Sequence, residues 1–236
     1  MMYTSNVALN RETHASMTLS PSPGGYRFAA DSLTSMIAVS EFFDAARCYP
    51  IIFSAFGDNQ VVPLALLGLE KDENLFVDAA GVWDAPYIPA FIRRYPFITS
   101  EDTDGRMTVC FDEAYDGFNL EGGDPMFENG EPSERCRKIQ EFLQDFHLRM
   151  EQNKVFCSRL QELELLQEIA AHASLEDGRE FDLNGMLVVN EMKFDELPDD
   201  EVLRLFRSGE IAFIHAHLLS LRNLGALAAR KSRRSA

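Results

Sequence analysis

Residues 51–79, which read IIFSAFGDNQVVPLALLGLEKDENLFVDA, decide the fold class. Three apolar runs at 51–56, 61–69 and 74–79 are separated by two short polar stretches, 57–60 and 70–73, that have the composition of turns. A crossover between parallel strands needs a dozen or more residues, so connections this short require antiparallel neighbours. The stretch therefore predicts an antiparallel sheet meander with flanking helices, which is an α+β fold and not a doubly wound one.

Two short helices are expected beside this meander. Ser40 is a suitable N-cap for a helix in which Phe42, Phe43 and Ala46 share one face until a proline ends it. After the meander, prolines at the first turn and at the exit frame a second helix over 86–94. Both helices would cover the sheet with aromatic side chains.

A strand is expected at 106–112, and a Gly- and Asp-rich loop follows it at 113–131. Loops of this length are usually functional or disordered. The bulky residues Phe118, Met126 and Phe127 predict that this loop packs against the body of the protein.

The second half of the chain begins with a helical pattern. The apolar positions that follow the helical period are Ile139, Phe142, Leu143, Phe146 and Met150. The pattern resumes out of phase at Phe156, which predicts two helices broken near Asn153. Helices are also expected at 199–208, with acids in its first turn, and at 210–229.

A hairpin is predicted between these helical parts. Asp177 and Gly178 lie between the short apolar segments 169–175 and 179–183, and Asp-Gly is a strong hairpin signal. The segment 186–190 would be a third strand.

Three regions follow from these elements. Residues 1–24 are polar and end in Pro-Ser-Pro-Gly, which predicts an extended N-terminal arm. Residues 25–131 form an antiparallel α+β core with the aromatic helix. Residues 132–236 hold helices plus the hairpin, and this part is either a second subdomain or a continuation of one unit.

The charge of the chain restricts its partners. The 236 residues carry a net charge of −16, with 38 acidic and 22 basic side chains, so a nucleic-acid partner is not expected. The only basic patch is at 230–234, with Arg230, Lys231, Arg233 and Arg234. Residues 1–20 show no cationic segment before an apolar run, so neither a signal peptide nor a membrane span is expected and a cytoplasmic location is the default. A location at the cell envelope would need signal-independent export.

No motif for catalysis or metal binding is evident. His215 and His217 are two apart and would point away from each other on a helix, with His215 packed in the core or at an interface and His217 on the opposite flank. No pair of cysteines has metal-site spacing, and the four cysteines are expected to be reduced and to act as small buried hydrophobes. The alternative is a reactive thiol, for which Cys136 between two arginines is the best candidate. Acids such as Asp112 and Asp116 lie close together by chance in so acidic a chain, although a catalytic dyad or a weak cation site stays open. Neither a cofactor nor a metal is expected.

The segment 83–97 has the most distinctive composition. The only tryptophan, Trp83, lies there with Tyr87, Tyr95 and the pair Arg93 and Arg94. Trp, Tyr and Arg are the usual anchors of binding surfaces. These five residues form the candidate partner- or ligand-binding site. The alternative is that the apolar side chains fill the core and the arginines pair with nearby acids.

The sequence also resembles the SapC family of bacterial proteins, which is named for association with a surface layer. The matching stretches are YPIIF at 49–53, LLGL at 66–69, NLFVD at 74–78, GVW at 81–83, YIPAFIRRYPF at 87–97, GEP at 130–132 and AHLLSL at 216–221. The resemblance spans about 14–227 and implies a single full-length unit of that family. It implies an accessory role beside surface-layer, outer-membrane receptor or flavin-dependent halogenase systems, and no catalytic residue carries over from it.

Two functions are weighed on these grounds. The first is a non-catalytic, SapC-type protein that binds a protein partner through the surface around Trp83, Tyr87, Arg93 and Arg94. The second is an enzyme or enzyme subunit acting on peptides or surface polymers, with its site between the aromatic helix and the loop at 113–131. A homodimer is compatible with either, since closed dimers are the commonest oligomers.

Overall fold

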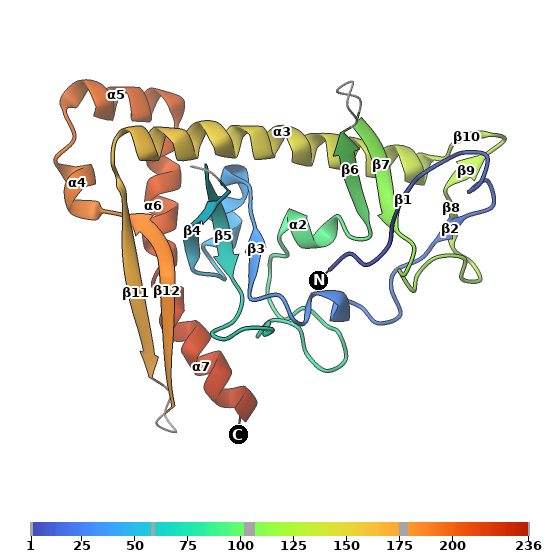
Figure 1. The fold of residues 1–236 in the computed structure, drawn as a ribbon, viewed down its shortest axis with the longest axis horizontal. Coiled ribbons are helices and arrows are strands. Elements are labelled where there is room, and N and C mark those ends of the chain that lie inside the picture. The colour runs from blue at the N-terminus through green and yellow to red at the C-terminus, as the bar shows by residue number, and fades with distance from the viewer. Residues whose placement is uncertain (1, 58–59, 102–106, 175–178, 236) are drawn as a thin grey trace.

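The computed structural model describes residues 2–57, 60–101, 107–174 and 179–235 and places a five-stranded and a three-stranded antiparallel sheet along one long helix (Figure 1), together with the two-stranded pairs β2-β8 and β9-β10. The strands are β1 (Asn6–Ala8), β2 (Thr18–Leu19), β3 (Thr34–Met36), β4 (Ile51–Phe56), β5 (Gln60–Leu66), β6 (Phe97–Glu101), β7 (Met107–Asp112), β8 (Asp124–Pro125), β9 (Phe127–Glu128), β10 (Glu131–Pro132), β11 (Leu166–Ser174) and β12 (Glu180–Val189). The helices are α1 (Phe42–Ala45), α2 (Ala90–Arg93), α3 (Glu134–Glu162), α4 (Glu191–Asp195), α5 (Asp199–Ser208), α6 (Glu210–Ser220) and α7 (Asn223–Ser235), with 3-10 turns at Arg27–Ala29 and Val39–Glu41.

The larger sheet has the strand order β11-β12-β4-β5-β3, and every neighbouring pair in it is antiparallel. A smaller sheet has the order β1-β7-β6. The α+β class, the antiparallel sheets and the helical C-terminal part are therefore confirmed.

Two of the three strands predicted for the meander are confirmed. The expected strands β4 and β5 pair from Ile51 opposite Ala65 to Phe56 opposite Gln60. The third run, 74–79, was predicted as a strand and is not one. The Asn74 side chain accepts a hydrogen bond from the Phe76 N–H and donates one to the Ala29 carbonyl, which turns the chain away from the sheet. The edge of β5 is taken by β3 instead.

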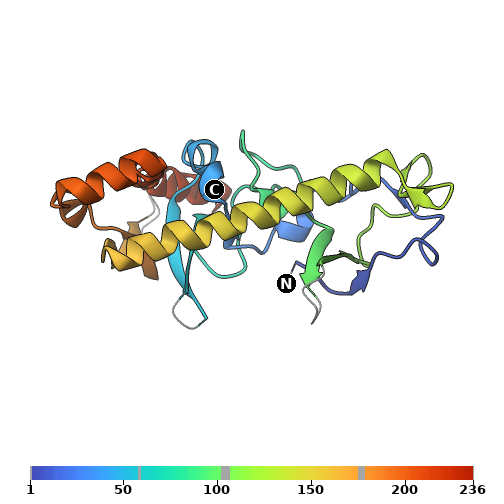
Figure 2. The same ribbon diagram turned by 90° about the horizontal axis from the view of Figure 1, so that it is seen from above.

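The predicted break near Asn153 is wrong, because α3 is one helix of 29 residues that runs along the length of the molecule (Figure 2). Two hydrophobic clusters lie beneath it. The first part of α3 contributes Cys136 and Leu143 to one cluster, and the last part contributes Phe156 and Leu160 to the other. The apolar stripe changes phase because the helix packs on two differently placed cores.

The hairpin forms as expected, although its tip at 175–178 lies outside the described residues. The predicted separate strand at 186–190 is wrong, since β12 continues to Val189 past an irregularity opposite Ile169 and Ala171. Gly185 in that irregularity has φ 73°, a conformation that glycine adopts without strain. Leu187 of β12 pairs with Phe53 of β4, so the hairpin extends the larger sheet. The division of the chain at residue 131 stays a prediction.

Both predicted short helices are shorter than expected. The helix after Ser40 is a 3-10 turn followed by the four residues of α1, and Phe43 is 55% exposed while Phe42 is buried. The helix predicted at 86–94 is reduced to the four residues of α2. Pro89 precedes α2, and the preceding residues follow an irregular path set by side-chain hydrogen bonds described below.

The N-terminal residues are more closely packed than a free arm. Strand β1 pairs with β7, and β2 pairs with β8 in the loop 113–131. Met17 and Leu19 are buried, as are Met126 and Phe127 of that loop. The arm and the loop therefore cover the second cluster together, and the expectation that the loop packs down is confirmed.

The C-terminal part contains α5 with the predicted bounds, ended by Gly209 at φ 80°. The longer helix predicted at 210–229 is interrupted at Leu221 and Arg222, which separates α6 from α7. Among the described residues, Glu210–Arg234 is the one stretch long and apolar enough for a membrane span, judged by length and composition alone. Core helices meet the same criterion, so the expectation of no membrane segment stays a prediction.

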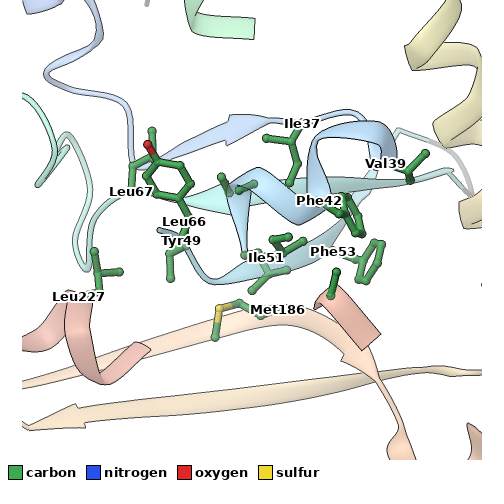
Figure 3. Close-up of a cluster of buried hydrophobic side chains, with 14 of the residues drawn as sticks. Ile37, Val39, Phe42, Tyr49, Ile51, Phe53, Leu66, Leu67, Met186 and Leu227 are labelled. Atoms are coloured by element: carbon green, nitrogen blue, oxygen red, sulfur yellow. The ribbon is translucent and has the colours of Figure 1, made fainter. Parts of the chain in front are cut away.

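The main hydrophobic cluster joins the larger sheet to α1, α3, α6 and α7, and Figure 3 shows its centre. Phe42, Ile51, Phe53 and Leu66 are almost entirely buried there. Met186 of β12 and Leu227 of α7 close the cluster from the C-terminal side. Residues from both halves of the chain thus share one core.

Candidate functional site

Trp83 lies in the hydrophobic core. Its ring is only 7% exposed and packs against Tyr26 and Phe76 in the main cluster. The indole N–H donates a hydrogen bond to the Tyr49 hydroxyl at 2.9 Å. A buried Trp needs a partner for its N–H and here finds it inside the core, and the expectation that Trp83 anchors a protein partner stays a prediction.

A buried carboxylate positions the segment that leads into α2. Glu41 accepts hydrogen bonds from the Ala38 and Ala90 backbone N–H groups at 2.7 and 2.8 Å and from the Tyr87 hydroxyl. The Tyr87 carbonyl accepts a hydrogen bond from Tyr49. Burial, followed by the contact with Glu41, raises the pKa of Tyr87. Tyr87 is therefore a half-buried support for α2, and the Arg93 guanidinium lies 5.9 Å from the centroid of its ring.

Arg93, Arg94 and Tyr95 line a pocket of about 470 Å³. Its wall comprises residues 19–22, 25, 26 and 28 near the N-terminus, residues 92–97, Tyr115, and residues 135, 138, 139, 142 and 143 of α3. We call this the cationic pocket because Arg93, Arg94, Arg135 and Lys138 are four of its lining residues.

Two of these cations were missed by the sequence analysis. Arg135 and Lys138 lie some forty residues beyond the aromatic segment, and nothing local connects them with it. A signal was nevertheless present, because Arg135, Lys138, Ile139 and Phe142 recur at spacings of three and four and so share one helix face. That face of α3 is the one that meets α2 and the arm.

The aromatic wall of the pocket is held in place by its own contacts. The rings of Phe28 and Tyr95 stack with centroids 4.1 Å apart. The Tyr115 hydroxyl donates to the Ser20 carbonyl at 3.0 Å, which fixes the N-terminal residues against the loop. The wall is thus built before any ligand arrives.

Arg93 is the last residue of α2, and Arg94 is its C-cap. Neither has a carboxylate partner among the residues that the structure describes. Arg93 donates through Nε to the Ile88 carbonyl at 2.9 Å, and its guanidinium lies over the Phe142 ring. Arg94 lies over Phe91 and Phe146, at 4.2 and 4.9 Å from the ring centroids, and its buried Nε has no hydrogen-bond partner. Burial lowers the pKa of Arg94.

The two pocket cations on α3, Arg135 and Lys138, form exposed ion pairs with acids. Arg135 is 3.9 Å from Asp124, and Lys138 pairs with Glu134 at 2.6 Å on the same helix. All four of these side chains are well exposed, and such pairs contribute little to stability. Arg135 and Lys138 can therefore turn toward a ligand at small cost.

Asp112 has a structural role beside the pocket. Its carboxylate accepts hydrogen bonds from the Thr4, Ser5 and Ala114 N–H groups and from the Tyr95 hydroxyl at 3.2 Å. Burial alone would raise the pKa of Asp112, but these backbone donors outweigh it and hold the pKa below its usual value. Asp112 thus ties the N-terminal residues to β7.

The core histidine is His217 and not His215. His215 is exposed, whereas His217 is fully buried, since α6 presents Ile214 and His217 to the sheet. His217 Nε2 accepts the Val189 N–H at 3.0 Å, and Nδ1 lies 2.9 Å from the Ile51 carbonyl. Burial lowers the pKa of His217 to about 4. The ring is a neutral bridge between β12 and β4.

The other reactive groups are also structural or buried. Cys136 is buried, and burial raises the pKa of its thiol, which agrees with the expected buried hydrophobe and not with the reactive-thiol alternative. Within the described ranges no group of three or more His, Cys, Asp or Glu side chains could hold a metal ion. The wall of the cationic pocket contains hydroxyls and cations but, among described residues, no His, Cys, Asp or Glu.

The C-terminal basic patch is largely occupied by contacts within the chain. Arg230 pairs with Asp84 and lies over the Phe76 ring, and Lys231 pairs with Glu70 and Glu73. The guanidinium of Arg234 donates to the carbonyls of residues 74 and 77. α7 thereby clamps the loop before Trp83, and its cations are poorly placed to bind a polyanion.

The comparisons with known proteins agree with the resemblance noted in the sequence. The family model SapC matches residues 9–227 of the 236-residue chain. No curated protein and no solved structure gives a significant match. Because the family model spans most of the chain, from β2 to the first turn of α7, the chain belongs to the SapC family.

Proposed function

We propose that this SapC protein is a non-catalytic accessory protein that binds a protein partner at the cationic pocket. The observation that carries the proposal is the convergence of Arg93, Arg94, Arg135 and Lys138 on one pocket in a chain of net charge −16. Arg is enriched at the centres of binding interfaces, and an isolated basic site on an acidic protein selects an acidic group on its partner.

The make-up of the pocket favours binding over catalysis. Acid–base and nucleophilic mechanisms need groups such as His, a carboxylate or a thiolate beside the substrate. The described wall supplies Ser, Tyr, Arg and Lys side chains and no group that would act as a general base near neutral pH. An association with surface-layer or outer-membrane systems follows from the family name and is part of the same proposal.

The test is affinity capture from the native cell with two matched variants. Arg135→Ala with Lys138→Ala removes two exposed cations of the pocket, and Lys154→Ala with Arg204→Ala removes two exposed cations elsewhere, each paired with an acid three residues away. We expect a stoichiometric partner that is retained by the wild type and the control and lost by the pocket variant.

Equal capture by both variants would contradict the proposal. If the purified protein instead hydrolyses peptides or surface polymers, the enzyme alternative replaces it. The melting temperatures of the two variants should agree within a few degrees, because exposed ion pairs contribute on the order of 0–1 kcal/mol.

A further inference from the structure

The geometry points to a carboxylate attached to an apolar body as the group that the cationic pocket binds. This inference rests on the proposed function and names the chemistry of the ligand.

The arginines of the cationic pocket differ from other cations of the chain in their partners. Elsewhere in the described chain, cations such as Arg149, Lys154 and Arg204 are each bonded to a carboxylate. Arg93 and Arg94 are not, although the chain has 38 acidic side chains. The Arg93 guanidinium, which lies over the lining residue Phe142, therefore leaves a positive charge at the pocket that an incoming anion would complete.

The wall of the cationic pocket is mostly apolar. Most of the lining side chains are apolar or aromatic, among them Leu19, Phe28, Ile92, Ile139, Phe142 and Leu143. A volume of about 470 Å³ lies in the range of sites that enclose a small molecule or the end of a peptide. The body of the ligand should then be apolar, with the charge at one end.

A carboxylate fits this pocket better than a phosphate does. A guanidinium fork binds either group through two parallel hydrogen bonds. A phosphate at neutral pH carries close to two charges, and moving it into a mostly apolar pocket costs more solvation free energy than moving a single charge. The described wall also offers no glycine-rich phosphate loop. The carboxylate is therefore favoured, either as the C-terminus of a partner chain or as a free organic acid.

The experiment is calorimetric titration of the full-length protein with two matched pairs of probes and with phenyl phosphate for comparison. One pair is 4-phenylbutanoate and its neutral amide, and the other is a decapeptide ending in Phe with a free or an amidated C-terminus. We expect at least one acid to bind about tenfold or more tightly than its amide, since about 1.4 kcal/mol of charge-assisted hydrogen bonding corresponds to that factor.

Two variants locate the binding. Arg93→Gln with Arg135→Gln should remove the difference between acid and amide, and Lys154→Gln with Arg204→Gln should leave it unchanged. Preference for the peptide acid identifies a chain terminus as the ligand, and preference for phenylbutanoate alone identifies a free organic acid. Equal binding of acid and amide, tighter binding of phenyl phosphate, or no binding of either acid overturns the inference.

The outcomes also separate this inference from the proposed function. If capture of a partner depends on Arg135 and Lys138 while acids and amides bind equally, the carboxylate is wrong and the partner role stands. If the acid is preferred while capture is unaffected by the pocket variant, the partner role is wrong and the carboxylate site stands.

Discussion

At the scale of single residues, His217 shows how a buried titratable group makes stability depend on pH. The folded protein holds its pKa at about 4, and an unfolded chain has a histidine pKa of about 6.5. Between these values the unfolded chain binds a proton that the folded protein excludes. The contribution to stability is therefore complete above pH 6.5 and is lost as the pH falls toward 4.

The prediction for His217 is a loss of about 2 kcal/mol in the free energy of unfolding between pH 7.5 and pH 5. His217→Gln should be less stable at pH 7.5, because a buried bridge between β12 and β4 is altered, and its stability should depend less on pH. Urea unfolding at several pH values measures both quantities. Parallel pH profiles for the two proteins would show that His217 is not the group responsible.

At the scale of elements, α3 depends on one buried polar side chain. Asn153 is 5% exposed in the middle of the helix. Its Oδ1 accepts the Val39 N–H and its Nδ2 donates to the Ile37 carbonyl, both at 2.8 Å. The side chain therefore satisfies two backbone groups of the segment between β3 and α1.

The prediction for α3 is that Asn153→Leu destabilises the protein by about 2–4 kcal/mol, because two buried backbone groups lose their partners. Lys154→Leu, at the exposed neighbouring position, should change the free energy of unfolding by less than about 1 kcal/mol. Denaturant unfolding of both variants decides. A cost for Asn153→Leu no larger than that of its neighbour would mean that water replaces the lost bonds.

The same elements show what the sequence could predict. α5 was predicted with its bounds because acids mark its start and Gly209 marks its end within one local stretch. The prediction of a break in α3 is wrong because the apolar stripe changes phase where the helix passes from one hydrophobic cluster to the other. The sequence of the helix alone does not show that two clusters lie beneath it. Trp83 was placed on the surface because composition does not reveal that Tyr49 would accept its N–H.

The candidate site was predictable only in part for a similar reason. Arg93, Arg94 and Tyr95 were found because they are adjacent in the sequence and line the pocket together. Arg135 and Lys138 join them only through the packing of α3 against α2 and the N-terminal residues. A contact between segments forty residues apart has no local signal beyond the helical spacing of its residues.

At the scale of the whole molecule, two hydrophobic clusters share α3, and this predicts a single cooperative unfolding transition. The only tryptophan lies in the main cluster, so its fluorescence reports on that cluster, while far-UV circular dichroism reports on all helices. The two signals should give the same midpoint in urea. Separate midpoints would show that the two clusters unfold as independent units.

The central claim is that Arg93, Arg94, Arg135 and Lys138 form one anion-binding pocket. The most direct measurement follows the arginine side-chain Nε–H resonances of ¹⁵N-labelled protein during titration with 4-phenylbutanoate, with assignments from single Arg→Lys variants. We expect saturable shifts of the Nε–H resonances of Arg93, Arg94 and Arg135, and no shifts for Arg149 or Arg204. Uniform, non-saturating shifts of all arginines, or saturable shifts confined to residues outside the pocket, would contradict it.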